Sequence, residues 1–201
     1  MLDFTYELEC QSKGFKNICG IDEAGRGPLA GPVVAAAVIL PLGIIIDELD
    51  DSKKLTEKKR EKLFDIIVEE ALDFSVGIAT EKEIDEMNIL RATFLAMKRA
   101  VEGLKNPSDY ALVDGNLNPN IGLPVTCLVK GDGKSPSIAA ASIIAKVTRD
   151  RMMLDLDEKF PQYNFKKHKG YGTKLHYEKI KEYGISDAHR RTFLKNLNEH
   201  E

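Results

Sequence analysis

Two apolar runs joined by a short glycine- and proline-rich segment constrain the fold more than any other feature of the chain. The runs cover about 17–22 and 33–40, and the segment between them reads GRGPLAGP. Both runs have the length and the apolar character of buried strands. The connection is too short to hold the crossover helix that parallel neighbours need. The pattern therefore predicts an antiparallel hairpin with a wide loop.

The rest of the chain alternates predicted strands with predicted helices. Three further strand-like runs lie at about 73–79, 109–113 and 125–130. Helices are predicted from Thr56 to about Ala71, from a capping box at Thr80 and Glu83 to about Gly103, from Ser135 and Pro136 to about Lys159, and from Thr173 onward. The order predicts an α/β fold, with a mixed β-sheet flanked by helices and a helical C-terminal extension.

Length and cysteine usage indicate one domain in a reducing compartment. A chain of 201 residues fits a single domain, 1–201, in which about 161–201 would form the extension. The three cysteines form no CxxC pair and no zinc spacing, which favours the cytoplasm. The N-terminus lacks the pattern of a signal peptide, and no apolar stretch is long enough to span a membrane, so we expect no membrane partner.

The charges are distributed unevenly. The formal net charge of −3 argues against binding nucleic acid through bulk charge alone. Between Asn164 and Lys181, however, the chain carries six lysines and only one glutamate. Such a stretch is either a solvated surface or a patch that meets an acidic partner.

Two segments imitate nucleotide-binding motifs but are incomplete. Gly25 to Ala30 matches the dinucleotide pattern G-x-G-x-x-A, yet a predicted strand follows where that motif needs a helix. Gly131 to Ser135 reads GDGKS, like the end of a phosphate-binding P-loop, but Leu128 stands where the first glycine of that loop belongs. A nucleotide triphosphatase that uses Gly131–Ser135 remains an alternative function.

Four carboxylates follow predicted strands. Asp22 and Glu23 follow the first strand, Asp114 the fourth, and Asp132 the fifth. The carboxyl ends of strands form the edge where α/β sheets gather ligands. Adjacent strand residues point to opposite faces, so we expect the first strand to end between Asp22 and Glu23 and the chain to turn there.

Clustered carboxylates repel one another unless cations lie between them. Oxygen ligands suit Mg²⁺ or Mn²⁺, and two such ions can hydrolyse a phosphodiester. With two divalent ions bound, the formal charge of −3 would become +1. Taken singly, each of these residues could equally be a turn residue or a helix cap, so spacing alone leaves both interpretations open.

At these residues the chain closely resembles bacterial ribonuclease HII, in the type 2 ribonuclease H family. The matching segments are GIDEAGRGPLAGPVVAAAVIL, DSKKLT, VDGN, KGD, SIAAASIIAKVTRD, HKGYGT and HRRTF, in the order of the family and over nearly the whole chain. The sister family, ribonuclease HIII, typically has GKG in place of GRG and a longer N-terminal extension. The GRG sequence and the short lead-in favour type HII.

The resemblance implies a ribonuclease H-like fold and an endonuclease that hydrolyses the RNA strand of RNA–DNA hybrids. It also implies incision at single ribonucleotides embedded in duplex DNA, with two Mg²⁺ or Mn²⁺ ions, and products with 5′-phosphate and 3′-hydroxyl ends. We expect a monomer. A module that binds RNA–DNA hybrids without cutting them is the second alternative.

The resemblance also assigns residues. The metal-binding and catalytic acids would be Asp22, Glu23, Asp114 and Asp132. The ribose 2′-hydroxyl would be contacted by Gly25, Arg26 and Gly27, largely through backbone groups, and Tyr171 would stack on the next sugar. Candidates for phosphate contacts are Lys53, Lys54, Lys146 and Lys169. Asp150 lies in a matching segment within a predicted helix, and we interpret it as structural.

Overall fold

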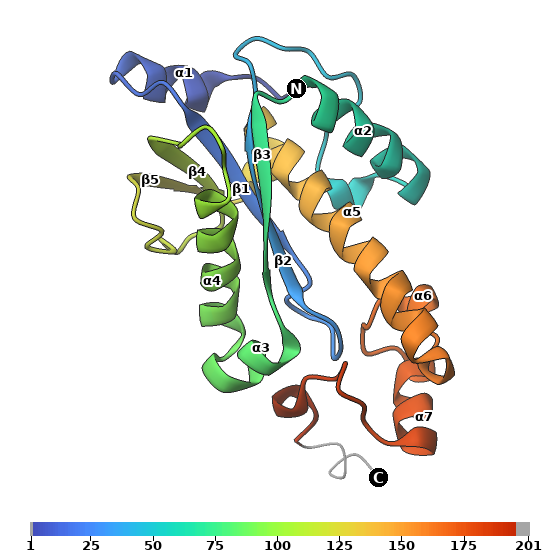
Figure 1. The fold of residues 1–201 in the computed structure, drawn as a ribbon. Coiled ribbons are helices and arrows are strands. Elements are labelled where there is room, and N and C mark those ends of the chain that lie inside the picture. The colour runs from blue at the N-terminus through green and yellow to red at the C-terminus, as the bar shows by residue number, and fades with distance from the viewer. Residues whose placement is uncertain (1, 196–201) are drawn as a thin grey trace.

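A mixed five-stranded sheet forms the centre of the computed structural model, which describes residues 2–195 (Figure 1). The strands are β1 (Ile18–Ala24), β2 (Val33–Ile39), β3 (Asp73–Ala79), β4 (Tyr110–Asp114) and β5 (Val125–Leu128). Their order across the sheet is β3-β2-β1-β4-β5. The pairs β1–β2 and β2–β3 are antiparallel, whereas β1–β4 and β4–β5 are parallel. The predicted hairpin and the predicted mixed sheet are both confirmed.

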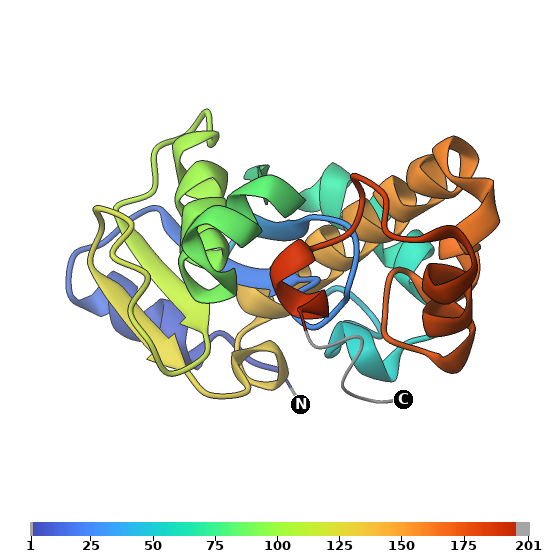
Figure 2. The ribbon, with the colours of Figure 1, turned by 90° about the horizontal axis from the view of Figure 1, so that it is seen from below.

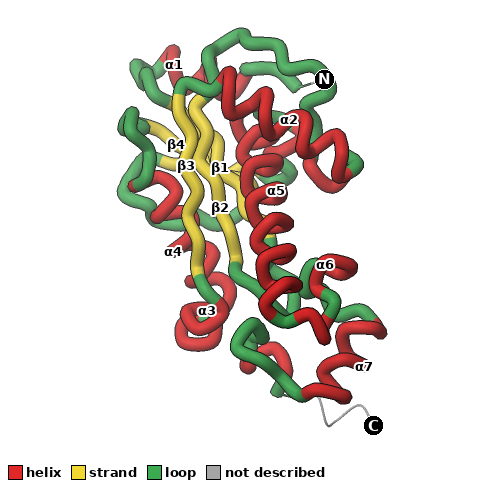
Figure 3. The backbone as a smooth tube through the Cα atoms, turned by 45° about the vertical axis from the view of Figure 1, so that its right-hand side comes forward, coloured by secondary structure: helices red, strands yellow, loops and turns green. Residues whose placement is uncertain are grey.

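Helices cover both faces of this sheet. They are α1 (Thr5–Ser12), α2 (Glu57–Glu70), α3 (Glu81–Met87), α4 (Ile89–Glu102), α5 (Pro136–Lys159), α6 (Phe165–His168) and α7 (Lys174–Tyr183), with short 3-10 segments η1 (Ser52–Lys54), η2 (Gly131–Gly133), η3 (Pro161–Tyr163) and η4 (Arg191–Leu194). Figures 1 and 3 show α4 on one face of the sheet and α5, with α2 beside it, on the other. No helix within residues 2–195 is long and apolar enough to cross a membrane.

Strand β2 shows why the sheet needs two helical layers. Its odd-numbered residues, such as Ala35 and Ala37, pack in one apolar cluster with α4. Its even-numbered residues, such as Ala36 and Val38, pack in a second cluster with α2 and α5. A strand that is buried on both faces reads as a continuous apolar run, as VVAAAVI does.

The predicted helix that begins after Thr80 is two helices. The capping box of Thr80 and Glu83 is present, and α3 ends at Met87. Asn88 then adopts a φ of 74°, and its side chain accepts hydrogen bonds from the amides of Leu90 and Arg91 at the start of α4. A positive φ is uncommon outside glycine, but asparagine is a good cap, so one residue both ends α3 and begins α4.

Helix α1 is absent from the sequence-based predictions because its residues show no apolar stripe. Its contribution to the fold is Glu7, which is buried against the first turn of α5. The Glu7 carboxylate accepts hydrogen bonds from the Ser135 hydroxyl at 2.6 Å and the Ser137 amide at 3.2 Å. A negative charge is favourable at a helix N-terminus, where amide groups lack partners.

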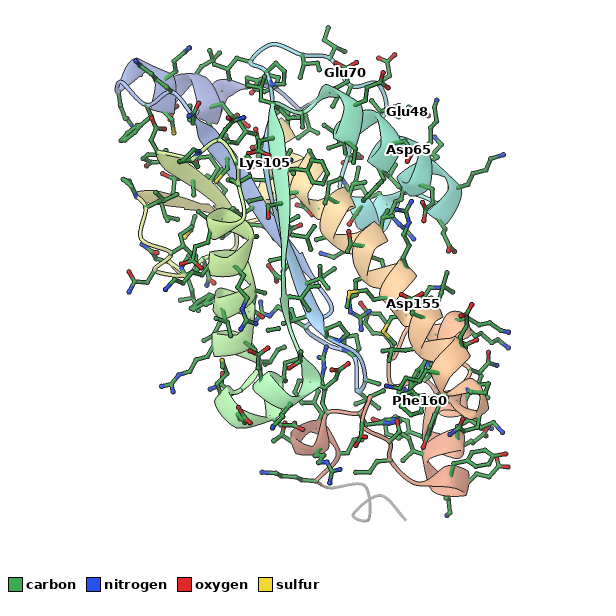
Figure 4. All side chains as sticks on the ribbon, viewed as in Figure 1. Glu48, Asp65, Glu70, Lys105, Asp155 and Phe160 are labelled. Atoms are coloured by element: carbon green, nitrogen blue, oxygen red, sulfur yellow. The ribbon has the colours of Figure 1, made fainter. Side chains whose placement is uncertain are left out.

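The residues after α5 form a lobe of short helices, which confirms the predicted helical extension. Figure 4 labels Asp155 and Phe160 near the end of α5, where this C-terminal lobe begins. Figure 2 shows that its last segment lies against the loop between β1 and β2. The apolar side chains between them come from both parts of the chain, including Leu29, Tyr163 and Phe165.

Three buried histidines lie inside the C-terminal lobe, and we call them the histidine cluster: His168, His176 and His189. The rings of His168 and His176 stack with their centroids 4.3 Å apart. His168 Nε2 lies 2.9 Å from the carbonyl oxygen of Tyr163, while its Nδ1 accepts from the amide of Gly170 at 3.2 Å. Each nitrogen of His168 therefore has a partner only when the ring is neutral.

The hydrogen bonds of the other two rings also assign neutral tautomers. His176 Nδ1 donates to the carbonyl oxygen of Tyr171 at 2.9 Å, so its Nε2 is left as an acceptor. His189 Nε2 donates to that atom at 3.1 Å, and His189 Nδ1 accepts from the amide of Ser186 at 3.0 Å. An added proton on either ring would break one of these bonds.

Candidate active site

The four candidate acids lie at the carboxyl ends of the three parallel strands. Pairing between β1 and β4 stops where Ile21 faces Val113, while pairing between β1 and β2 continues to Ala24. The last part of β1 therefore has an open edge beside the end of β4. Asp22 and Glu23 lie on this open edge, and Asp114 is the last residue of β4.

The expectation that the first strand ends between Asp22 and Glu23 is wrong. Strand β1 continues through both residues to Ala24. Ile21 packs in the cluster on the α4 face, so by alternation Glu23 shares that face and Asp22 takes the α5 face. Both carboxylates still interact electrostatically with Asp114, because no strand separates them from the end of β4.

Backbone geometry after β5 brings Asp132 to the same edge. Lys130 adopts a left-handed φ of 56°, and the 3-10 turn η2 follows at once. Within this turn the Gly131 amide donates to Asp114 Oδ1 at 2.7 Å. Asp132 is the next residue, and its carboxylate is buried. The GDGKS segment thus connects two acids, and its first amide is used by a carboxylate.

Burial and neighbouring carboxylates raise the pKa values of three of the acids. The pKa of Asp22 is well above its usual value, first because of burial and then because of Glu23 and Asp114. Burial also raises the pKa of Glu23; Arg26 opposes this shift and Asp114 adds to it. The pKa of Asp132 is raised by burial, by Asp51 and by Asp114. This repulsion is what an added cation would relieve.

Asp51 is a fifth carboxylate at this site that sequence reasoning missed. It precedes η1, where its side chain accepts from the Lys53 amide at 2.9 Å, and it raises the pKa of Asp132. The segment DSKKLT was available as a signal, but it lies between a predicted strand and a predicted helix, away from the predicted strand ends. Only the packing of that loop against η2 brings the two carboxylates together.

Lys53 faces the acids rather than open solvent. Burial lowers the pKa of its ammonium group, but Asp22, Asp51 and Asp132 more than compensate, so the pKa is raised overall. The other candidate lysines have protein partners at their ammonium groups. Lys54 pairs with Asp50 at 2.9 Å, Lys146 with Asp150 at 2.7 Å, and Lys169 donates to the carbonyl oxygen of Lys166 at 2.9 Å.

Asp150 has the contacts of a structural carboxylate. It is buried in α5, and it also lies 3.8 Å from the guanidinium of Arg60. Arg60 in turn donates to the carbonyl oxygen of Ser52 at 3.1 Å. These contacts hold the segment that carries Asp51 and Lys53 against α5.

The donor set fits hard divalent cations. Asp22, Glu23, Asp114 and Asp132 offer only oxygen atoms, which Mg²⁺ and Mn²⁺ prefer over softer ligands. The raised pKa values of Asp22, Glu23 and Asp132 indicate an excess of negative charge at this edge. Across residues 2–195, no group of three or more His, Cys, Asp or Glu side chains is arranged so that it could already hold a metal ion.

A small pocket opens beside two of the acids. Glu23 and Asp114 line it together with Arg26, and α4 contributes Phe94 and Met97. The pocket combines carboxylates with an apolar wall, as small-molecule and substrate sites commonly do.

The GRG segment and Tyr171 meet next to this pocket. Gly25 adopts a φ of +96°, which disfavours residues with a Cβ. A Cβ added to Gly27 would lie 3.9 Å from Tyr171 Cε1, so the tyrosine ring lies directly against the segment. The Arg26 side chain is 3.4 Å from Glu23 and half exposed. The structure therefore brings together the residues that were assigned to the sugar, although they are far apart in sequence.

Comparison with known proteins finds similar sequences and similar structures. The family model described as Ribonuclease HII matches residues 19–196. A ribonuclease HII of Clostridioides difficile (strain 630) is 56% identical over 192 residues, covering 96% of this chain and 75% of the relative. One from Caldicellulosiruptor saccharolyticus is 56% identical over 194 residues, covering 96% and 95%. Among solved structures, the ribonuclease H2 from Pyrococcus horikoshii OT3 has a TM-score of 0.77 at 30% identity, covering 92% of this chain and 96% of that one.

Proposed function

The chain belongs to the ribonuclease HII family and is a metal-dependent endoribonuclease that acts on RNA–DNA hybrids; from this premise we propose the finer activity. The enzyme incises the strand at single ribonucleotides embedded in duplex DNA as well as in longer hybrids. Its products carry 5′-phosphate and 3′-hydroxyl ends. The proposal is supported by the gathered acids and by the contact of the GRG segment with Tyr171.

We assign the metal site to the four acids. Asp22 and Asp114 would hold both ions, and Glu23 and Asp132 would complete their shells. Two divalent ions at such a site activate the attacking water and stabilise the leaving oxygen of a phosphodiester. Mg²⁺ and Mn²⁺ both suit the oxygen donors, and one structural neighbour, a ribonuclease HIII, was solved in complex with Mn²⁺. Substrate oxygens would supply part of the shell.

The chain's own residues orient the substrate at the metal site. The Gly131 amide fixes the direction of the Asp114 carboxylate by its hydrogen bond of 2.7 Å. Lys53 keeps a positive charge beside the acids and is the candidate lysine best placed to meet a phosphate oxygen. Lys54, Lys146 and Lys169 would need to leave their present partners to do the same.

Ribose recognition is assigned to Gly25, Arg26, Gly27 and Tyr171. The 2′-hydroxyl can donate and accept, and it is the group that distinguishes RNA from DNA. Glycines allow backbone groups to approach a sugar closely, and the ring of Tyr171 is 44% exposed and thus available for stacking. The Arg26 side chain extends toward Glu23, so its backbone is the part assigned to the sugar.

We further propose that the chain works as a monomeric single domain in the cytoplasm. The C-terminal lobe, about 161–201, would bind the duplex through its lysine-rich surface, although residues 196–201 lie outside the described part of the structure. The cysteines within residues 2–195 are all free, which is compatible with a reducing compartment.

A nicking assay tests the proposal. Wild-type protein with Mg²⁺ or Mn²⁺ should cut duplex DNA that contains one ribonucleotide, and it should leave the matched all-DNA duplex intact. Asp22→Asn or Asp114→Asn should bind the duplex and not cut it. Asp65→Asn, on the exposed side of α2 (Figure 4), is the matched control and should cut normally.

The nicking assay and a separate assay of nucleotide hydrolysis distinguish the alternatives. Folded wild-type protein that binds the duplex and never cuts it, with either metal, would support a non-catalytic hybrid-binding module. Nucleotide hydrolysis that survives Asp22→Asn and is lost in Lys134→Ala would support a triphosphatase. Cutting of the all-DNA duplex would refute the assignment of the GRG segment and Tyr171.

A further inference from the structure

Two fully buried arginines lie behind the GRG segment, and within residues 2–195 neither has a carboxylate at hydrogen-bond distance. Arg149 in α5 and Arg190, just before η4, are both 0% exposed. The seven hydrogen bonds that their side chains donate within residues 2–195 all end on backbone carbonyl oxygens. Both residues lie in segments that match the family, but sequence reasoning gave neither of them a role.

Arg190 binds the GRG segment directly. Its Nη2 donates to the carbonyl oxygen of Gly25 at 2.5 Å, and its Nη1 donates to that of Arg26 at 2.9 Å. Its Nε donates to the carbonyl oxygen of Gly31 at 2.9 Å. The planar guanidinium thus fixes two successive peptide groups of the GRG segment. It also holds the Gly31 carbonyl group, just before β2 begins.

Fixing these carbonyl groups also fixes the amides. In a trans peptide the C=O and N–H bonds point in opposite directions, and the described chain has no cis peptide bond. The peptide groups whose oxygens face Arg190 carry the N–H groups of Arg26 and Gly27. These two adjacent donors therefore point away from Arg190.

Arg149 ties the same segment to the loop that carries Tyr171. Its Nη2 donates to the carbonyl oxygen of Ala30 and its Nη1 to that of Lys169, both at 3.1 Å. A Cβ on Gly25 would come within 2.0 Å of Arg149 Nε, so the arginine occupies the space that a side chain would need. The Leu29 amide adds a direct bond to the carbonyl oxygen of Gly170 at 2.8 Å.

We propose that Arg190, supported by Arg149, is a positioning residue for ribose recognition: it holds the amides of Arg26 and Gly27 outward as a donor pair for the 2′-hydroxyl and keeps Tyr171 at a fixed distance from them. Lysine cannot replace either arginine, because its ammonium group lacks the planar fork that reaches several carbonyls at once. The inference rests on the proposed role of the GRG segment.

The buried positive charge is tolerated through oriented dipoles. Burial and the neighbouring Arg149 lower the pKa of Arg190 to about 9, so it remains a cation at neutral pH. The carboxylates of Glu81 and Asp85 partly offset the charge from a distance. Backbone carbonyl dipoles thus take the place of a salt bridge. The Arg190 guanidinium donates its hydrogen bonds to these carbonyl groups.

The test measures ribose preference in a non-cleaving background. In Asp22→Asn protein with Mg²⁺, affinities are compared for a duplex with one ribonucleotide and for the matched all-DNA duplex. Arg190→Lys should reduce the preference for the ribonucleotide about tenfold, which corresponds to one lost hydrogen bond. Affinity for the all-DNA duplex should change much less. Arg191→Lys, at the exposed neighbouring arginine, is the matched control and should keep the preference.

The outcomes separate this inference from the proposed function. If the parent protein does not prefer the ribonucleotide, the role of the GRG segment fails. If the parent prefers it and a folded Arg190→Lys variant keeps the full preference, the positioning role is wrong. Should that variant melt below the assay temperature, Arg149→Lys is measured in the same way. Independently, NMR of the parent should show larger shifts of the Arg26 and Gly27 amides with the ribonucleotide duplex than with all-DNA; equal shifts would overturn the inference.

Discussion

Lowering the pH from 7.5 to 4.5 should destabilise the fold through the histidine cluster. The pKa values of His176 and His189 are lowered to about 4, mainly by burial, from an ordinary value of 6.5. Between these values the unfolded chain binds protons that the folded protein excludes, so stability falls as the pH drops below 6.5 and levels off near pH 4. Above pH 6.5 both states are neutral and the effect is absent.

The size of the effect follows from the pKa difference between the two states. The difference between 6.5 and about 4, at about 1.36 kcal/mol for each pKa unit, gives about 3.4 kcal/mol for one histidine. The two rings share one hydrogen bond, between their Nε2 atoms, so a proton on one ring disturbs the other. Because the unfolded chain binds a proton on each histidine, we expect a loss of about 3–5 kcal/mol in the free energy of unfolding by pH 4.5.

Other groups also titrate between pH 7.5 and 4.5, and their contributions to stability must be separated from those of His176 and His189. His168 lies in the cluster, and burial lowers its pKa as well, with Asp157 opposing this shift. The raised pKa values of Asp22, Glu23 and Asp132 act in the opposite direction, because protonation of these acids favours the folded state as the pH falls. Comparing two variants at each pH cancels the contribution of the acids.

The assay is urea unfolding of wild type and His189→Gln at four pH values between 7.5 and 4.5. At pH 7.5 the variant should be less stable by about 1–3 kcal/mol, because His176 Nε2 and the Ser186 amide lose their buried hydrogen bonds to His189. This difference should shrink by about 2 kcal/mol at pH 4.5, because only the wild type loses the stability that depends on keeping His189 neutral in the folded state. A difference that stays constant over the range, or an NMR titration of His189 near 6.5, would refute the reasoning.

Three further predictions concern other parts of the chain. Asn88→Ala should lower the free energy of unfolding by about 2 kcal/mol, through the lost cap and the left-handed φ, and Asn88→Gly should lower it less, as measured by urea unfolding. Glu7→Ala should cost about 1–3 kcal/mol, because the Ser135 hydroxyl loses its buried acceptor; a melting temperature equal to that of wild type would contradict this. Mn²⁺ at ten times its dissociation constant should stabilise the wild type by about 1.4 kcal/mol and leave the melting temperature of Asp114→Asn nearly unchanged.

Local signals made much of the fold predictable. The hairpin followed from a short connection between apolar runs, and the start of α5 followed from Ser135 with Pro136, because capping chemistry depends only on nearby residues. Helix α1 could not be predicted, since its position depends on a bond between Glu7 and residues almost 130 positions later.

The site was predictable in its residue types and only partly in its geometry. The carboxyl ends of strands gather side chains in any parallel arrangement, so the sequence made the four acids candidates, and the family resemblance then assigned them to metals. How Asp22 and Glu23 reach one edge from opposite faces depended on β4 stopping earlier than β2, which no local pattern encodes. Asp51, Arg149 and Arg190 were missed for the same reason, since their roles arise from long-range packing.

The contact between Arg190 and the GRG segment also sets an order of events during synthesis. The two partners are separated by 164 and 165 residues along the chain. At about 5–20 residues per second, the ribosome needs roughly 8–30 s to add the arginine after the segment has been made. Until then the β1–β2 hairpin can form, but its loop lacks the side chain that orients it. If the proposed roles hold, the nascent chain acquires the proposed metal-binding edge before it acquires the proposed selectivity for ribose.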